Sequence, residues 1–89
     1  GSRELANAGY VSGGTQRNLE DLAHMLDFAE TIDADTRALL SDPQTSGGLL
    51  ICIPPTRLDQ LLSDLEGKAS AAAVLGLIVN GNPGHINVE

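Results

Sequence analysis

Two short polar stretches hold the residues that could bind a ligand. The first is Gly13-Gly14-Thr15, followed by Arg17 and Asn18 at the start of a helical pattern. Free backbone N–H groups and the positive end of a helix dipole favour an anion at such a place. A tight turn in which Thr15 caps the helix explains the same residues without a ligand. The stretch is not a P-loop, which needs a Lys and a Ser or Thr after its second glycine.

The second polar stretch, residues 42–48, ends in a pair of glycines and runs into an apolar segment. Its polar side chains are close enough in sequence to bind a ligand together. They could equally satisfy local backbone groups in a structural turn. The candidate residues of this stretch are Asp42, Gln44, Thr45, Ser46, Gly47 and Gly48.

The sequence predicts no catalytic residue and no metal site. A nucleophilic Ser46 would need a base, and no motif links His24 or His85 to it. The acidic residues are scattered without metal-ligand spacing. Cys52 lies in an apolar run and is expected to be an inert core residue.

The apolar segments are expected to form a small sheet. The run after Gly48 contains no polar residue before its closing prolines, which predicts a strand at about 48–54 that is buried on both faces. A second apolar run predicts a strand at 71–79, with Gly76 at a bulge or a close backbone approach. Alternation of polar and apolar residues predicts a last strand at 85–88.

Three helices are expected to pack against this sheet. Apolar spacing predicts helices at 16–26, 34–40 and 57–66, with N-caps Thr15, Asp33 and Thr56 respectively. Residues 3–12 are too mixed to assign, although a short helix could end there with Gly9 as its terminator. The order of elements indicates an α+β fold.

Composition limits the function classes. The 89 residues suit one small domain, or part of a larger one, with an aliphatic core that buries a little over 60% of the unfolded surface. A net charge of −7 with five Lys or Arg argues against a nucleic-acid partner. No apolar run is long enough to cross a membrane, and one cysteine fits a reducing compartment, so a cytoplasmic protein is expected. Gly1-Ser2 looks like a cloning remnant and is left out of the fold reasoning.

Both polar stretches resemble motifs of one enzyme family. Asp42-Pro43-Gln44-Thr45-Ser46-Gly47-Gly48-Leu49-Leu50 is similar to the signature segment near the C-terminus of selenophosphate synthetase (selenide, water dikinase). The upstream stretch from Gly13 to Asn18 resembles the second C-terminal motif of that family, and the segment from Ala72 to Val88 resembles its closing strands.

The resemblance implies a piece of an enzyme that makes selenophosphate from selenide, ATP and water with Mg²⁺, releasing AMP and phosphate. Family members are homodimers with an N-terminal ATP-binding domain and a C-terminal domain like that of aminoimidazole ribonucleotide synthetase. Residues 3–89 resemble the second half of this C-terminal domain. The segments that carry the family's reactive Cys or selenocysteine, its Lys and its metal-binding aspartates have no counterpart here, and Cys52 does not correspond to the reactive residue.

The expected role is therefore to shape the nucleotide cleft, through the candidate residues Gly13, Gly14, Thr15, Asn18, Asp42, Gln44, Thr45, Ser46, Gly47 and Gly48. The chain alone is expected to be inactive and to bind neither ATP nor Mg²⁺ tightly. Its expected partners are the rest of the parent enzyme and further copies of itself, because half a domain leaves a sheet edge and an apolar face open. The alternatives are a stand-alone binding or assembly module and a fragment of another ATP-using enzyme of the same superfamily.

Overall fold

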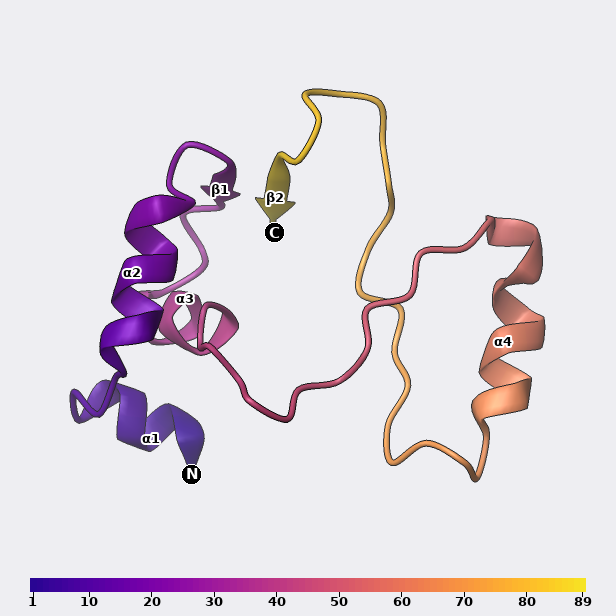
Figure 1. Ribbon diagram of the computed structural model, residues 1–89, viewed down its shortest axis with the longest axis horizontal. Coiled ribbons are helices and arrows are strands. Elements are labelled where there is room, and N and C mark those ends of the chain that lie inside the picture. The colour runs from indigo at the N-terminus through magenta and orange to yellow at the C-terminus, as the bar shows by residue number, and fades with distance from the viewer. The chain divides into compact units, whose positions relative to one another are not determined.

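The computed structural model describes residues 1–89, which form four α-helices, one 3-10 turn and two short strands (Figure 1). The α+β class predicted from the sequence is confirmed. The chain divides into two units, of which the first comprises residues 1–47 and 81–89 and the second residues 48–80. The second unit is thus an insertion in the sequence of the first.

Two helices open the first unit. Helix α1 spans Ser2–Asn7, and Gly9 follows it with a φ of +85°, which agrees with its predicted role as terminator. Helix α2 spans Gly13–Asp21, so the predicted helix at 16–26 begins three residues too late and continues too far. Its N-cap is Ser12, whose hydroxyl accepts a hydrogen bond from the Thr15 backbone N–H at 3.1 Å. The prediction that Thr15 is the N-cap is therefore wrong, because Ser12 already takes that position.

Helix α3, Ala34–Leu40, has the bounds predicted from the sequence. The Asp33 carboxylate caps it by accepting the Thr36 backbone N–H at 2.8 Å. Arg3 of α1 donates hydrogen bonds to both Asp33 and Thr36, so α1 and α3 are joined at the capped end. Asp33 and Thr36 thus fix the start of α3 and also hold α1 against it.

A two-stranded parallel sheet completes the first unit. Strand β1, Leu26–Phe28, pairs with strand β2, Ile86–Val88, in the register Leu26↔Ile86 to Phe28↔Val88. Strand β2 confirms the predicted last strand at 85–88, whereas β1 replaces the predicted end of the first helix. The Arg37 guanidinium of α3 lies 5.1 Å from the centre of the Phe28 ring, which connects the helix to the sheet.

The second unit contains a 3-10 turn, Pro55–Arg57, and helix α4, Leu58–Leu65, which together confirm the predicted helix at 57–66. The predicted Thr56 cap is wrong, because Thr56 lies inside the 3-10 turn and no side chain caps α4. The four leucines of α4 are half-buried, while its intervening polar residues are exposed. These leucines are Leu58, Leu61, Leu62 and Leu65.

The predicted strands at 48–54 and 71–79 are wrong, because neither segment is a strand in the structure. No backbone hydrogen bond joins them to each other or to another segment, so their strand-forming composition finds no partner to pair with. Leu49 is 90% exposed and Ile78 is 86% exposed, which contradicts burial on both faces. Cys52 is also exposed rather than in a core, and no atom lies close to Gly76 to account for that glycine.

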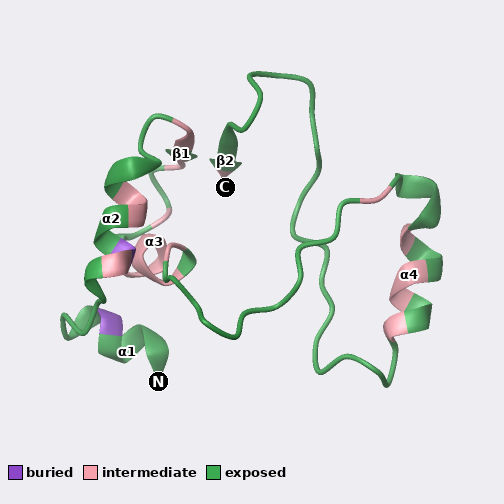
Figure 2. Ribbon diagram, viewed as in Figure 1, coloured by how far each residue is buried: buried purple, intermediate pink, exposed green.

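The predicted aliphatic core is not present. Ala6 and Thr15 are the buried residues of the chain (Figure 2). The accessible surface is 7596 Å², whereas the unfolded chain would expose about 13,000 Å², so less than half of that surface is buried instead of a little over 60%. No helix of the structure is long and apolar enough to cross a membrane.

Candidate ligand-binding site

The two polar stretches meet at the Thr15 side chain, which is 1% exposed. Its hydroxyl donates a hydrogen bond to the Asp42 carboxylate over 3.2 Å. The Ser12 hydroxyl oxygen lies 3.0 Å from the hydroxyl oxygen of Thr15. Thr15 is therefore a structural link between the start of α2 and the turn that follows α3, and its hydroxyl is fully engaged within the protein.

A second contact lies one helical turn further along α2. The Asn18 side-chain amide donates a hydrogen bond to the backbone carbonyl of Ser41 at 2.8 Å. Ser41 is the last residue before the second polar stretch and follows α3 directly. Two hydrogen bonds from one face of α2 thus hold the end of α3 in a fixed position.

Gly14 makes the close approach of the two stretches possible. A Cβ atom at this position would lie 2.6 Å from Cγ of Pro43, which is closer than real Cβ atoms come. A Cβ atom at Gly13 would lie 3.6 Å from the Arg17 guanidinium, which is an ordinary contact distance. Of the two glycines, only Gly14 is therefore required by packing.

A hollow of about 360 Å³ lies beside this junction, within the first unit. Thr15, Asp42 and Gln44 contribute its polar wall, and Gln44 is held in the turn by a 2.8 Å bond from its backbone N–H to the Asp42 carbonyl. The other lining residues come from α1, the loop after it and α3. They are Ser2, Leu5, Ala6, Tyr10, Val11, Ala38 and Leu39.

The remaining candidate residues lie outside this junction. The side chains of Thr45 and Ser46 are exposed and make no hydrogen bond within the protein. Gly47 packs near the Gln44 side chain, while Gly48 belongs to the second unit and has no atom close to it. The structure thus brings together half of the candidate residues: Gly14, Thr15, Asn18, Asp42 and Gln44.

Three residues of the junction were not among the candidates: Ser12, Ser41 and Pro43. The signal for Ser12 was present in the sequence, because a serine three residues before Thr15 fits an N-cap that accepts the Thr15 N–H. Ser41 contributes only its backbone carbonyl, and Pro43 only its ring. Residue type carries no signal for contacts of that kind.

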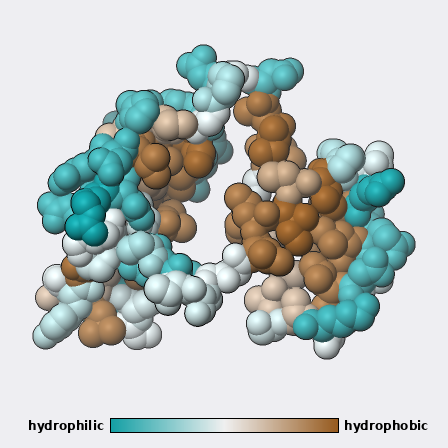
Figure 3. All heavy atoms as spheres, viewed as in Figure 1, coloured by the Kyte–Doolittle hydropathy of each residue, from teal (hydrophilic) through white to brown (hydrophobic).

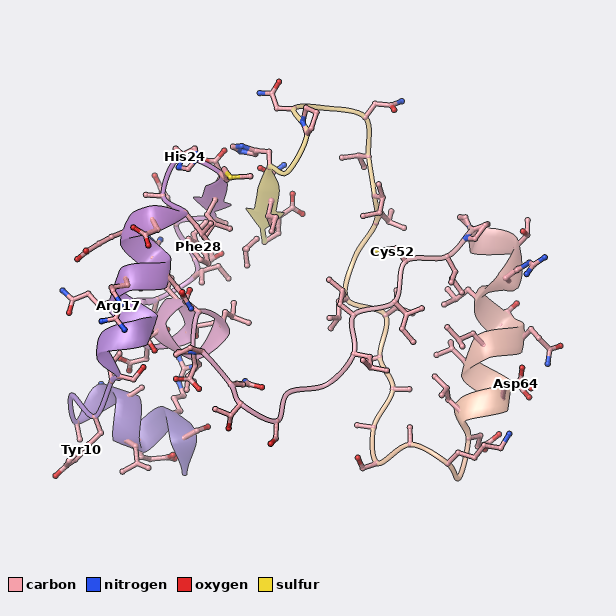
Figure 4. All side chains as sticks on the ribbon, in the orientation of Figure 1. Tyr10, Arg17, His24, Phe28, Cys52 and Asp64 are labelled. Atoms are coloured by element: carbon pink, nitrogen blue, oxygen red, sulfur yellow. The ribbon has the colours of Figure 1, made fainter.

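The titratable side chains show no arrangement for metal binding. No group of three or more His, Cys, Asp and Glu residues lies together in the chain, so its residues do not fit a Mg²⁺ site by themselves. His85 lies 2.7 Å from the Asp27 carboxylate across the β1–β2 pair, and His24 is exposed (Figure 4).

The pKa of Asp33 is lowered by the hydrogen bond from the Thr36 backbone, with further contributions from the Thr36 hydroxyl and Arg3. The lowered pKa of Asp33 is therefore explained by its role as the N-cap of α3.

Sequence comparison relates the chain to the dikinases. Over its whole length it is homologous to selenide, water dikinases. It is 38% identical over 89 residues to the enzyme of Carboxydothermus hydrogenoformans, 38% over 87 residues to that of Pelobacter propionicus and 33% over 89 residues to that of Salmonella typhimurium. The matches cover 97 to 100% of the chain.

The chain spans about a quarter of the length of these relatives, between 25 and 26%. No family model matches it. No solved structure matches it either. The resemblance to selenophosphate synthetase is thus confirmed as homology to a segment of that enzyme, even though the strand predicted from the apolar run at residues 48–54 is not formed.

Proposed function

We propose that the chain is the C-terminal segment of a selenide, water dikinase and that it forms part of the wall of the nucleotide cleft. In this proposal the parent enzyme converts selenide, ATP and water into selenophosphate, AMP and phosphate. The segment contributes positioning rather than chemistry, since it has neither a nucleophile with a base nor a cluster of metal ligands.

The junction of the two polar stretches is the observation that carries the proposal. The residues that resemble the two family motifs are 27 positions apart in sequence, yet Thr15 and Asp42 are hydrogen-bonded to each other. The bond brings the two motif stretches to one place in the first unit, as a common wall of a cleft requires.

The free backbone N–H groups at the start of α2, next to Thr15, are suited to phosphate groups. The backbone N–H groups of Gly13 and Gly14 make no hydrogen bond, because they stand in the first turn of α2. The Thr15 N–H, in contrast, is occupied by Ser12. In the proposal the two free N–H groups face the nucleotide phosphates, and the Thr15–Asp42 bond keeps the neighbouring turn in place.

A chimeric enzyme tests the proposal. The homologous quarter of the Carboxydothermus hydrogenoformans enzyme is replaced by this chain, and selenide-dependent formation of AMP from ATP is measured. We expect the chimera to be active, and we expect Asp42→Asn within it to lower kcat/KM for ATP by about tenfold through loss of positioning. The matched variant Asp59→Asn, on the exposed side of α4, should leave activity unchanged.

Two results would contradict the proposal. One is a chimera that folds and dimerises like the parent enzyme but forms no AMP. The other is micromolar binding of ATP to the isolated chain in a calorimetric titration, because that would show a complete nucleotide site within these 89 residues. The second result would favour a stand-alone binding module.

A further inference from the structure

The loop that leads from the second unit back to the first contains the one Asn-Gly pair of the chain, Asn80-Gly81. Both residues are exposed, and they lie in a bend outside every helix and strand. In the space-filling view this loop is hydrophilic, in contrast with the hydrophobic run at residues 71–79 that precedes it (Figure 3). Water therefore reaches the side-chain amide of Asn80 and the backbone that follows it.

No hydrogen bond holds the two groups that would react. The side-chain amide of Asn80 makes none, and the backbone N–H of Gly81 makes none either. A Cβ atom at Gly81 would have no neighbour within 4 Å, so packing does not fix the backbone there. Glycine also has the greatest backbone freedom of all residues and no side chain to shield its own nitrogen. Rotation about single bonds can therefore bring the Gly81 nitrogen to the side-chain carbonyl carbon of Asn80.

We propose that Asn80 is a site of spontaneous deamidation in the folded chain. The Gly81 nitrogen forms a bond to the side-chain carbonyl carbon of Asn80, and the bond from that carbon to the side-chain nitrogen breaks. The proton of the attacking nitrogen passes to the departing group, which leaves as ammonia, and a cyclic succinimide remains. Water then opens the ring at either carbonyl and gives aspartate or isoaspartate. Overall, asparagine and water become aspartate or isoaspartate and ammonia, with no oxidation or reduction.

The two helical asparagines are protected from this reaction. Asn7 donates a side-chain hydrogen bond to Asp35 over 3.0 Å, and the N–H of the next residue is bonded to the Glu4 carbonyl at 3.0 Å. Asn18 lies inside α2, and its side-chain amide donates to the Ser41 carbonyl over 2.8 Å. Ring closure at either residue would break both a side-chain bond and the helical backbone.

The other two asparagines are protected by the residues that follow them. Asn82 precedes Pro83, whose nitrogen carries no proton and cannot form the ring. Asn87 lies in strand β2 and precedes Val88, whose branched side chain crowds its own nitrogen. Asn80 is thus the asparagine in which both the following residue and the structure allow the reaction.

The modification changes the link between the two units and none of the contacts within them. Each product replaces a neutral amide by a carboxylate, which adds one negative charge to a chain of net charge −7. In isoaspartate the side-chain methylene also becomes part of the main chain, so the link is lengthened. Because no element contains Asn80, the modified chain should stay folded and accumulate. This chemistry does not depend on the role of the Thr15–Asp42 junction.

The test incubates the full chain at mildly alkaline pH and physiological temperature and maps its peptides by mass spectrometry over time. Deamidation raises the mass of a peptide by about 1 Da, and a protein isoaspartyl methyltransferase with a labelled methyl donor detects isoaspartate. We expect Asn80 to react at least about tenfold faster than each of the other four asparagines. The reaction should be about as fast in the folded chain as in urea, since the structure does not restrain the loop.

Two variants separate this chemistry from a general instability of the loop. Gly81→Ala adds a Cβ that meets no other atom, so it should leave the fold intact while slowing the reaction at Asn80 by at least about tenfold through restricted approach. The control Asn82→Ala removes the neighbouring asparagine and should leave the rate at Asn80 unchanged. Far-UV circular dichroism checks that both variants keep their helices.

Three results would overturn the assignment. One is an Asn80 that stays intact in the folded chain but reacts in urea, because the loop would then restrain it. Another is equally fast modification at any of the other asparagines. The third is an unchanged rate at Asn80 in the Gly81→Ala variant, because the Gly81 nitrogen would then not be the attacking group.

Discussion

Thr15 is the most deeply buried residue of the chain. Its side chain is buried, and its hydroxyl contacts both Ser12 and the Asp42 carboxylate. Loss of the hydroxyl would leave two polar groups without a partner in a part-buried place, and unmade hydrogen bonds of this kind are costly. The residue has this importance for folding whether or not a ligand binds beside it.

Thr15→Val should lower the free energy of unfolding of the first unit by about 1–2 kcal/mol, because the methyl groups keep the volume while the hydrogen bonds are lost. Urea unfolding followed by the fluorescence of Tyr10, the one tyrosine of the chain, measures the effect in the first unit. Thr15→Ser retains the hydroxyl and should cost clearly less. Equal midpoints for the two variants would show that the hydroxyl contributes little.

The two neighbouring glycines should respond oppositely to alanine. Gly14→Ala would bring Cβ to 2.6 Å from Cγ of Pro43. The start of α2 would have to move away from the turn that follows α3, at a cost of about 1–3 kcal/mol. Gly13→Ala meets only an ordinary contact and should be neutral or stabilise α2 slightly, since alanine favours helix. The same unfolding measurement compares them, and a larger loss for Gly13→Ala would contradict the packing described here.

At the scale of elements, local signals located the helices but misplaced two of their three caps, and they predicted two strands that do not form. Asp33 and the apolar spacing after it gave the bounds of α3, because a cap and its helix are neighbours in sequence. Strand β1 was missed, since Leu26 continues the helical spacing of α2 and the strand has only three residues. The apolar segments of the second unit, residues 48–53 and 71–79, have strand composition, but a strand also needs a partner, which composition cannot supply. The Thr15–Asp42 bond was likewise beyond prediction, because it depends on how α2 and α3 pack.

The cap of α3 should make stability depend on pH in acid. The pKa of Asp33 is lowered from its ordinary value of 3.8, so the folded chain binds this proton less readily than the unfolded chain does. The stabilisation is therefore complete above pH 3.8 and is lost as the pH falls through the lowered pKa.

Asp33→Asn keeps a capping side chain but removes the titration and the charge opposite Arg3. We expect wild type to be more stable than the variant at neutral pH, and the difference to shrink as the pH falls below 3.8. Urea midpoints at several pH values test this. A difference that stays constant as the pH is lowered further would rule out the Asp33 carboxylate as its source.

At the scale of the whole molecule, the two units should unfold separately, because each has its own set of contacts. Leu62→Ala removes a half-buried leucine of α4 and should reduce the helical signal of the second unit. The Tyr10 transition of the first unit should keep its midpoint. The matched change Leu39→Ala, at a half-buried position of α3, should lower the midpoint of the Tyr10 transition and leave the helical signal of the second unit unchanged. Both transitions shifting together in either variant would show a single cooperative unit.

The pairing of β1 with β2 has a consequence for how the chain is made in the cell. Leu26 and its partner Ile86 are sixty positions apart, with the whole second unit translated between them. At a synthesis rate of about 5–20 residues per second, β1 waits roughly 3–12 s on the ribosome before its partner exists. During that interval the inserted apolar segments are synthesised while β1 is still unpaired, so chaperone binding to the nascent chain should increase between the synthesis of Phe28 and that of Ile86.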